Sequence, residues 1–336
     1  MRLGPVTAHW LLLIFVVSSA RAAAEVRLGG CLLAVSDASG ELSRSGECDG
    51  EQGGLFLSSM GIAAIAPGTF DRMSITVLDL SDNLISALPS LPPSLIYLSL
   101  QQNRLGRLEE HQFSGCTNLE QLSLSRNVIA RLSHGVFRDL ARLQYLFLDS
   151  NLIAELPSGV FDALVALRGL DLAHNAITSL SQPLFNSLQV LDTLSLSHNE
   201  ISAVGPGVDV TGWVEVRNLP ALQRLYLDHN SIRFLPPDLF HTCTGLRRLE
   251  LQVNKLSSLP EQLFAKLPAL QHASLAENRI ATLPRDLFNV STALVFLDLS
   301  DNQVAISGMA DQGIFAPLTR LQEVSGFGAS DFGCRV

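Results

Sequence analysis

Short alternations of leucine with other residues recur along the chain, and a single asparagine follows each of them. One copy reads LDTLSLSHNEI at residues 191–201, where Leu191, Leu194 and Leu196 precede Asn199. The alternation across Leu194 and Leu196 suits a strand of three or four residues, because successive strand side chains point to opposite faces. A helical stripe would continue through positions i+7 and i+8, and this pattern does not. The chain is therefore expected to turn after each asparagine.

The asparagine returns at a nearly constant spacing, which indicates a repeat architecture. Successive steps are 20, 24, 24, 24, 24, 31, 24, 24 and 24 residues. Most copies fit L-x-x-L-x-L-x-x-N-x-[ILV], although Ala273 replaces a strand leucine in one of them. Periods of this length are typical of solenoids, in which each unit contacts only its neighbours. The repeat asparagines are Asn83, Asn103, Asn127, Asn151, Asn175, Asn199, Asn230, Asn254, Asn278 and Asn302.

The repeats are expected to stack, because one repeat alone cannot fold. The backbone entropy lost on ordering a repeat exceeds the free energy returned by burying its few aliphatic side chains. Stacked repeats share a parallel backbone ladder and cover each other's apolar faces. The composition allows a continuous core, since 47% of the 336 residues are hydrophobic and 16% are charged.

Two internal columns of side chains are predicted, one of asparagine and one of phenylalanine. Where the chain leaves the strand and turns inward, peptide groups lose their ladder partners, and an amide side chain offers them both a donor and an acceptor. The phenylalanines follow the repeat asparagines by ten residues, on the predicted outer side of the coil. They are Phe113, Phe137, Phe161, Phe185, Phe240, Phe264 and Phe288, with Phe70 and Phe315 as terminal counterparts.

With ten in-register copies of this motif, about residues 55–326 resemble the extracellular leucine-rich-repeat proteins with 24-residue repeats. That class includes secreted matrix proteoglycans, Slit-like guidance proteins and Toll-like receptor ectodomains. The resemblance implies an α/β, strand-rich solenoid: a right-handed curved coil with a concave parallel sheet of about ten strands and an irregular convex face. It does not specify a ligand, because the class binds proteins, glycans, lipids and nucleic acids on one scaffold.

The first residues are typical of a secretory signal peptide. Arg2 precedes an apolar run from Trp10 to Val17, and small residues follow at Ala20 and Ala22. This run is too short to span a bilayer, and no long apolar run follows it, so we expect a secreted chain without membrane insertion. We assign residues 1–24 to the signal peptide, 25–73 to an amino-terminal cap, 74–326 to ten repeats plus a degraded final one, and 327–336 to a short tail.

The five cysteines divide by position. In the proteins that this chain resembles, a disulfide usually closes the amino-terminal cap, so the resemblance implies a Cys31–Cys48 bond. Cys116 and Cys243 occupy the same repeat position five coils apart, which is roughly 24 Å at the spacing of a ladder. They cannot bridge each other, and we expect both to be small residues of the core.

The end of the chain departs from the pattern of the class. After Asn302 the repeat lengthens, and LTRLQEVSGF is a degraded copy without a spine asparagine. Many members end in a cysteine-rich cap, whereas this sequence ends in FGCRV, so we expect either a short improvised cap or a truncated version of a longer protein. An open sheet edge invites pairing with another chain. A homodimer through the carboxy-terminal edge or through Cys334 is therefore a candidate assembly.

Charge and motifs narrow the functional class. The formal net charge is −9, from 23 Lys and Arg against 32 Asp and Glu, and this disfavours nucleic acid and heparin as partners. The sequence contains no G-x-S-x-G elbow, no H-E-x-x-H, no P-loop and no C-x-x-C. We therefore expect a non-enzymatic protein without a cofactor, which binds a protein or a glycan.

The residues on either side of the central strand leucine should line the concave face, and all three tyrosines fall there. Tyrosine and arginine dominate binding hot spots, because they present large surfaces with polar tips. Strand propensity alone is the alternative explanation for aromatic residues at these positions. We predict two patches, Tyr97, Tyr145 and Phe147 toward the amino end, and Arg224, Tyr226, Arg248 and Glu250 toward the carboxy end.

Two further candidates lie away from the strands. The 31-residue repeat carries seven extra residues, within GVDVTGWVEVRN, and Trp213 there is the only tryptophan outside the signal segment. Insertions in solenoids often lie on the binding face, so Trp213 is a candidate anchor, with packing against a neighbouring outer turn as the alternative. Asn289-Val290-Ser291 is an acceptor motif for N-linked glycosylation on a predicted outer turn.

A histidine column is the remaining candidate. His174, His198 and His229 precede the repeat asparagine in three successive coils and should stack about 5 Å apart. Imidazoles bind metals and change charge near neutral pH. However, a straight file converges poorly on one point, and Asp149 and Asp228, one residue earlier in their repeats, are not expected to share the column. The sequence therefore favours a tolerated polar position and no metal.

Three functions are compatible with these observations. The first is a secreted recognition or adhesion protein that binds a protein or glycan on its concave face. The second is the ectodomain of a transmembrane signalling receptor. The third is a structural component of the extracellular matrix, which associates through its outer face and its terminal edge.

Overall fold

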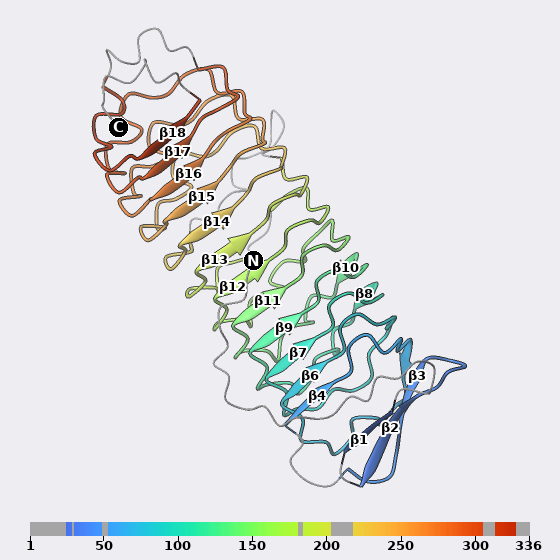
Figure 1. Ribbon diagram of the computed structural model, residues 1–336. Coiled ribbons are helices and arrows are strands. Elements are labelled where there is room, and N and C mark those ends of the chain that lie inside the picture. Colours follow the sequence, from blue (N-terminus) through green and yellow to red (C-terminus); the bar gives the residue numbers. More distant parts are fainter. Residues whose placement is uncertain are drawn as a thin grey trace.

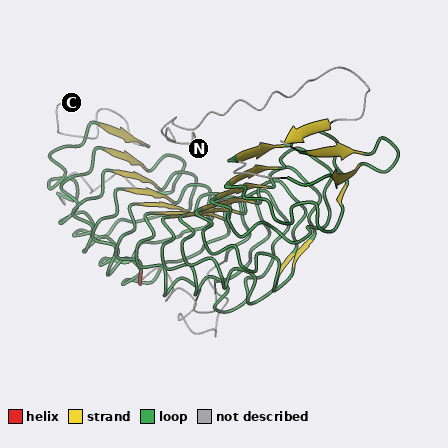
Figure 2. Ribbon diagram, turned by 90° about the horizontal axis from the view of Figure 1, so that it is seen from below, coloured by secondary structure: helices red, strands yellow, loops and turns green. Residues whose placement is uncertain are grey.

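The protein is one curved coil of stacked turns, with short strands on the inner side and loops on the outer side (Figures 1 and 2). The computed structural model describes residues 25–28, 30–48, 53–180, 184–202, 218–304 and 313–326. The predicted signal peptide, Trp213 and Cys334 lie outside these ranges.

A parallel sheet of twelve strands forms the concave face. The ten predicted repeat strands are all present, and their central residues pair in register from coil to coil, as Leu122, Leu146 and Leu170 do. These ten are β6 (Val77–Asp79), β7 (Tyr97–Ser99), β9 (Gln121–Ser123), β11 (Tyr145–Phe147), β12 (Gly169–Asp171), β13 (Thr193–Ser195), β14 (Arg224–Tyr226), β15 (Arg248–Glu250), β16 (His272–Ser274) and β17 (Phe296–Asp298). The predicted concave parallel sheet is confirmed.

Two further strands extend this sheet at its ends. β4 (Gly54–Phe56) precedes the first repeat strand, and β18 (Glu323–Ser325) comes from the degraded final copy. Neither coil carries the full repeat motif. Both still add a strand, because parallel pairing uses backbone groups that every residue except proline supplies.

A hairpin sheet covers the amino-terminal end of the coil. β1 (Glu25–Leu28), β2 (Cys31–Val35) and β3 (Glu41–Ser45) pair antiparallel, and β5 (Ala64–Ile65) pairs parallel to β3. β5 belongs to the first coil, so backbone hydrogen bonds join the hairpins to the solenoid. The Cys31–Cys48 disulfide is confirmed, with Cα atoms 4.8 Å apart.

The outer face is built from turns, as predicted. In one coil the backbone N–H groups of Val136, Arg138 and Leu140 donate to the carbonyl oxygens three residues earlier. Such segments are too short to add a second helical turn, and no α-helix occurs in the described ranges. β8 (Arg107–Leu108) and β10 (Arg131–Leu132) make one short parallel pair there. The fold is therefore a strand-rich solenoid whose convex side is irregular.

The asparagine column closes the inner corner of every repeat. Asn151 Nδ2 donates to the carbonyl oxygens of Leu124, Leu148 and Asp149 at 3.0, 3.0 and 3.2 Å, and its Oδ1 accepts the backbone N–H of Ile129 at 3.0 Å. All ten repeat asparagines accept a backbone N–H from the preceding coil. The predicted ladder is confirmed. Each asparagine side chain provides hydrogen-bond partners for buried backbone groups of two neighbouring coils.

The residue before each repeat asparagine adopts a left-handed backbone conformation. Its φ lies between 50° and 58° in all ten repeats, although none of these residues is glycine. This conformation is unfavourable for residues that carry a Cβ, so the surrounding hydrogen bonds must impose it. The sharp turn places these side chains in a column along one edge of the sheet. Its members are Asp82, Gln102, Arg126, Ser150, His174, His198, His229, Val253, Glu277 and Asp301.

The phenylalanine column fills the outer half of the core. Phe113, Phe137, Phe161 and Phe185 stack with ring centroids 6.1 to 6.2 Å apart. Phe264, Phe288 and Phe315 continue the column in later coils, at 5.8 and 6.0 Å. The seven rings at the repeat position are buried, so the predicted second spine is confirmed.

Candidate binding surface

The concave face presents the side chains on either side of each buried strand leucine. Four aromatic side chains are partly exposed there, namely Tyr97, Tyr145, Phe147 and Tyr226. Arg248 is exposed. The predicted alternation is confirmed in each repeat strand, because the central residue is buried. The predicted patch residues therefore lie on one surface of the molecule.

Glu250 is the exception among the predicted patch residues, because it is buried and only 4% exposed. Its Oε1 accepts a hydrogen bond from Arg248 Nε at 2.6 Å and lies 3.0 Å from His272 Nε2. His272 in turn stacks flat on Phe296, with ring centroids 4.2 Å apart and an interplanar angle of 3°. One buried carboxylate thus holds an arginine and a histidine in place, and an aromatic ring supports the histidine.

This arrangement enlarges the predicted carboxy-terminal patch. His272 and Phe296 occupy the same strand position as Arg224 and Arg248 in the next two coils, so the repeat register alone could have identified them. We call the enlarged surface the carboxy-terminal concave patch. It consists of Arg224, Tyr226, Arg248, Glu250, His272 and Phe296.

Arg224 is fixed by the neighbouring coil. Its Nη2 lies 3.2 Å from Asp192 Oδ1, and its Nε donates to Thr193 Oγ1 at 3.0 Å. The Arg224 side chain remains 48% exposed. An ion pair this exposed contributes little to stability. Together with the hydrogen bond to Thr193, the ion pair holds the guanidinium at the concave surface.

The predicted amino-terminal patch is not continuous. Tyr97 and Tyr145 occupy the same strand position, but β9 lies between their strands and places Gln121 between them. Tyr145 leans over Gly169, where an added Cβ would lie 2.8 Å from Tyr145 Cδ1. The glycine therefore makes room for the ring. We consider this patch the weaker of the two candidates.

Burial raises the pKa of two residues on the concave face. Burial raises the pKa of the Tyr97 phenol, a nearby hydrogen bond from Ser99 opposes the shift, and the charge of Asp79 adds to it. Tyr97 is therefore a hydrogen-bond donor at neutral pH. Burial also raises the pKa of Asp171, and the Asp149 carboxylate adds to that shift. These shifts follow the rule that a low-dielectric site disfavours the charged form.

The histidine column stacks as the sequence predicts. The ring centroids of His174 and His198 lie 4.1 Å apart, and those of His198 and His229 lie 3.9 Å apart. The expectation about Asp228 was wrong, because Asp228 Oδ2 lies 3.0 Å from His229 Nδ1. The strand end is tightly turned there, and Ser197 Oγ holds the other carboxylate oxygen at 2.5 Å. The carboxylate therefore faces the column.

The glycosylation motif lies on an outer turn. Asn289 is exposed, and its Nδ2 donates to Asp286 Oδ1 at 2.9 Å. Ser291 is fully buried, and its Oγ has no hydrogen-bond partner among the described residues. The corresponding position holds cysteine or leucine in other coils, including Cys116, Leu140 and Cys243. Packing therefore does not explain a hydroxyl at this position.

Cys116 and Cys243 are buried thiols of the core, as predicted. Burial raises the pKa of both thiols to about 11. Because the thiolate is the reactive form, neither residue is suited to redox chemistry or nucleophilic catalysis at neutral pH.

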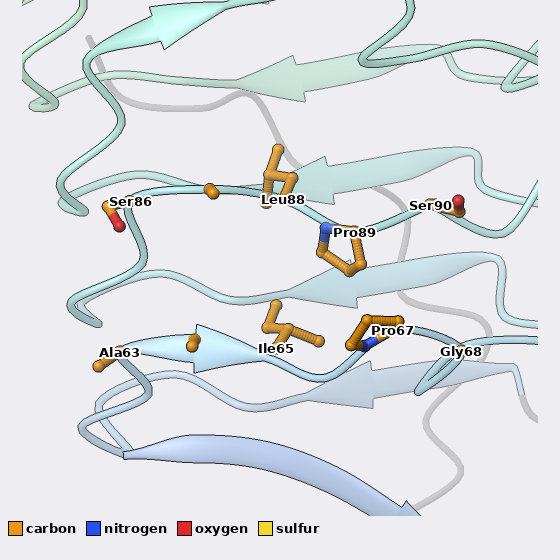
Figure 3. Close-up of a pocket in the computed structure, with 10 residues that line it drawn as sticks. Ala63, Ile65, Pro67, Gly68, Ser86, Leu88, Pro89 and Ser90 are labelled. Atoms are coloured by element: carbon orange, nitrogen blue, oxygen red, sulfur yellow. The ribbon is translucent and has the colours of Figure 1, made fainter. Parts of the chain in front are cut away.

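A shallow cleft of about 400 Å³ opens on the outer side between the first two coils. It is lined by residues from 63–68 and 86–90, and Figure 3 shows Ile65 and Pro67 opposite Leu88 and Pro89. The 20-residue repeat is the reason, because its shortened outer segment does not pair with β5 as β10 pairs with β8. The lining contains no charged side chain.

The fold, the asparagine ladder and the concave surface define a leucine-rich-repeat protein. The family profile "Leucine rich repeat" matches residues 93–153, 146–201, 216–256 and 244–304, and the chain belongs to this family. No curated protein matches the chain significantly. Among the described residues, no helix has the length and hydrophobicity needed to cross a bilayer.

Solved structures with this fold include three chains of known complexes. A chain of the octameric complex of Latrophilin 3, Unc5D and FLRT2 (LRR) matches with a TM-score of 0.71 and 25% identity, over 86% of this chain and 90% of that chain. A chain of the Toll–Spatzle complex from Drosophila matches at 0.64 and 21%, over 80% and 41%. A chain of the TLR13–ssRNA13 complex matches at 0.59 and 24%, over 76% and 41%. This ectodomain-like fold implies a protein-binding role.

Proposed function

We propose that the protein is a secreted, non-enzymatic recognition protein that binds a protein ligand on the carboxy-terminal concave patch. The observation that carries the proposal is the buried Glu250 carboxylate, which holds both Arg248 and His272. Side chains that are fixed before binding lose less conformational entropy when a ligand docks. The disulfide supports an extracellular location, because such bonds persist in oxidising compartments.

The composition of the patch also supports a protein ligand. Arginine and tyrosine are enriched at interface hot spots, and Phe296 adds apolar area next to them. Two of the structurally similar chains come from complexes with protein partners, namely the FLRT2 complex and the Toll–Spatzle complex. Those partners are the partners of those proteins.

The test is capture from extracellular extract, followed by affinity measurement on each captured protein. We expect the double variant Arg224→Glu, Tyr226→Ala to weaken binding by about 100-fold or more, because the two substitutions remove the arginine and the tyrosine that β14 contributes to the patch. Surface plasmon resonance measures the dissociation constant. The melting temperature of the variant should match that of the wild type, since neither side chain is part of the core.

The matched control carries the same kinds of change on the outer face. Arg142→Glu, Val165→Ala alters two exposed residues there, and its affinity should equal that of the wild type. Equal affinities for the concave variant and the control would place the ligand elsewhere. A captured glycan in place of a protein would also contradict the proposal.

We further propose that Asn289 carries an N-linked glycan. The buried, unpartnered hydroxyl of Ser291 supports this, because the acceptor motif requires it and the core does not. In protein from eukaryotic secretory cells, glycosidase treatment should lower the intact mass by one glycan. Asn289→Gln should abolish this difference, and so should Ser291→Ala.

The Ser291→Ala variant tests the effect of the hydroxyl on glycosylation and its effect on stability separately. It removes a hydroxyl that makes no hydrogen bond, so the deglycosylated variant should be at least as stable as the deglycosylated wild type. An unchanged mass after glycosidase treatment of the wild type would refute the glycan. A clear loss of stability in Ser291→Ala would refute the structural reasoning about the hydroxyl.

A further inference from the structure

Part of the histidine column lies at the contact between the two coils that the 31-residue repeat connects. His198 belongs to the coil before the seven-residue insertion, and Asp228 and His229 belong to the coil after it. The rings of His198 and His229 are stacked at 3.9 Å, and backbone φ values of 54° and 52° fix the direction in which they leave the chain. Both imidazoles are exposed, so water and ions reach them.

A carboxylate completes this group of side chains. One potential ligand atom from each of His198, Asp228 and His229 lies within 4.8 Å of the others. Asp228 is 8% exposed, and Ser197 Oγ holds its Oδ1, so its Oδ2 is directed toward His229 Nδ1 at 3.0 Å. Two ligands bound at about 2.1 Å to one tetrahedral ion lie roughly 3.4 Å apart. The separation of His229 Nδ1 and Asp228 Oδ2 is therefore close to that of two ligands on a single ion.

We propose that His198, Asp228 and His229 bind one divalent transition-metal ion of the zinc type. The ion takes the place of the proton between His229 Nδ1 and Asp228 Oδ2, and that proton is carried on His229 Nε2 instead. His198 reaches the ion by a rotation of its exposed ring, and water completes the coordination. Two imidazoles and one carboxylate favour zinc over magnesium or calcium, which prefer oxygen ligands.

The charge of these side chains suits a cation, because buried charges in proteins are paired or coordinate metals. The buried Asp228 carboxylate supplies the negative charge that a divalent ion requires.

The ion would join two coils that are 31 residues apart in sequence. Each coil is otherwise held to the next by three-residue strands, the asparagine ladder and core packing. A shared ligand set adds a link at the coil boundary where the insertion interrupts the 24-residue period. Metal binding is therefore expected to stabilise the folded array, because the unfolded chain does not hold the three ligands together.

The test is zinc titration of the full-length chain in a Cys334→Ser background, so that this thiol does not compete for metal. Isothermal titration calorimetry should show one zinc ion per chain. The melting temperature should rise by several degrees when zinc exceeds its dissociation constant by about a hundredfold. Magnesium and calcium at the same concentrations should cause no shift.

Single variants identify the ligands. His198→Gln should weaken zinc binding at least tenfold and remove the shift in melting temperature, and Asp228→Asn should act in the same direction. The matched control is His241→Gln, which changes an exposed histidine on an outer turn and should bind zinc as the wild type does. Imidazole resonances of His198 and His229, followed by NMR, should shift at one equivalent of zinc while that of His241 does not.

Three outcomes would overturn the site. The first is an unchanged melting temperature of the wild type at saturating zinc. The second is a zinc affinity that His198→Gln leaves intact. The third is an equal loss of affinity in the His241→Gln control, which would show general binding to surface histidines. If Asp228→Asn fails to fold, the NMR shifts of the wild type still decide between these results.

Discussion

Replacing Asn151 by leucine should lower the free energy of unfolding by about 3–5 kcal/mol. The leucine fills similar space but leaves the carbonyl oxygens of Leu124 and Leu148 and the N–H of Ile129 without the amide that they contact. Each buried group that loses its partner costs about 1–3 kcal/mol, and some of them regain weaker contacts as the turn relaxes. Urea denaturation followed by circular dichroism measures the change.

The control for this prediction is Asn118→Leu. Asn118 lies on an outer turn, where it bonds the Arg142 side chain and a carbonyl oxygen at the surface. Water replaces those partners, so the free energy of unfolding should change by less than about 0.5 kcal/mol. If both variants lose the same stability, the ladder is not the reason that asparagine occupies the repeat position.

Truncating Phe161 to alanine should destabilise the array by about 3–5 kcal/mol. Phe161 is fully buried between Phe137 and Phe185, with ring centroids at 6.2 and 6.1 Å, so its removal leaves a cavity and ends two ring contacts. Thermal unfolding and urea denaturation both report the loss. Hydrogen exchange should show that the coils on either side of Phe161 lose protection first, because each repeat is stabilised by its neighbours.

Val165→Ala provides the comparison within the same coil. Its side chain is 55% exposed, so the substitution should change the free energy of unfolding by less than about 0.5 kcal/mol. A Phe161→Ala variant as stable as Val165→Ala would mean that the phenylalanine column is not a structural spine. A uniform loss of protection along the whole array would instead show that the coils unfold as a single unit.

The repeat period explains how much of this structure the sequence predicts. Once identical positions recur every 24 residues, stacking places them in columns, and this is how the Asn151 and Phe161 contacts follow from spacing alone. The same reasoning predicts which residues face the concave side, including Tyr226 and Arg248. These predictions depend on the register of the backbone and not on the conformation of any one side chain.

Contacts between columns were not predictable in the same way. Glu250 was expected at the surface, but its carboxylate is buried under Arg248 and His272. Asp228 was expected outside the histidine column, but Ser197 holds it against His229. In each case a side chain contacts a residue of a different column. Such contacts depend on rotamers and local partners that a repeat motif does not encode.

The bulk of the phenylalanine column has a consequence for ligand recognition on the opposite side of the molecule. Neighbouring rings are 5.8 to 6.2 Å apart on the outside, whereas paired strands on the inside are about 4.8 Å apart. This difference makes successive coils fan out, so the strands form an arc (Figure 2). A smaller residue in the outer column would let the coils close up and would flatten that arc. The radius that a partner must match is therefore set by side chains that the partner never touches.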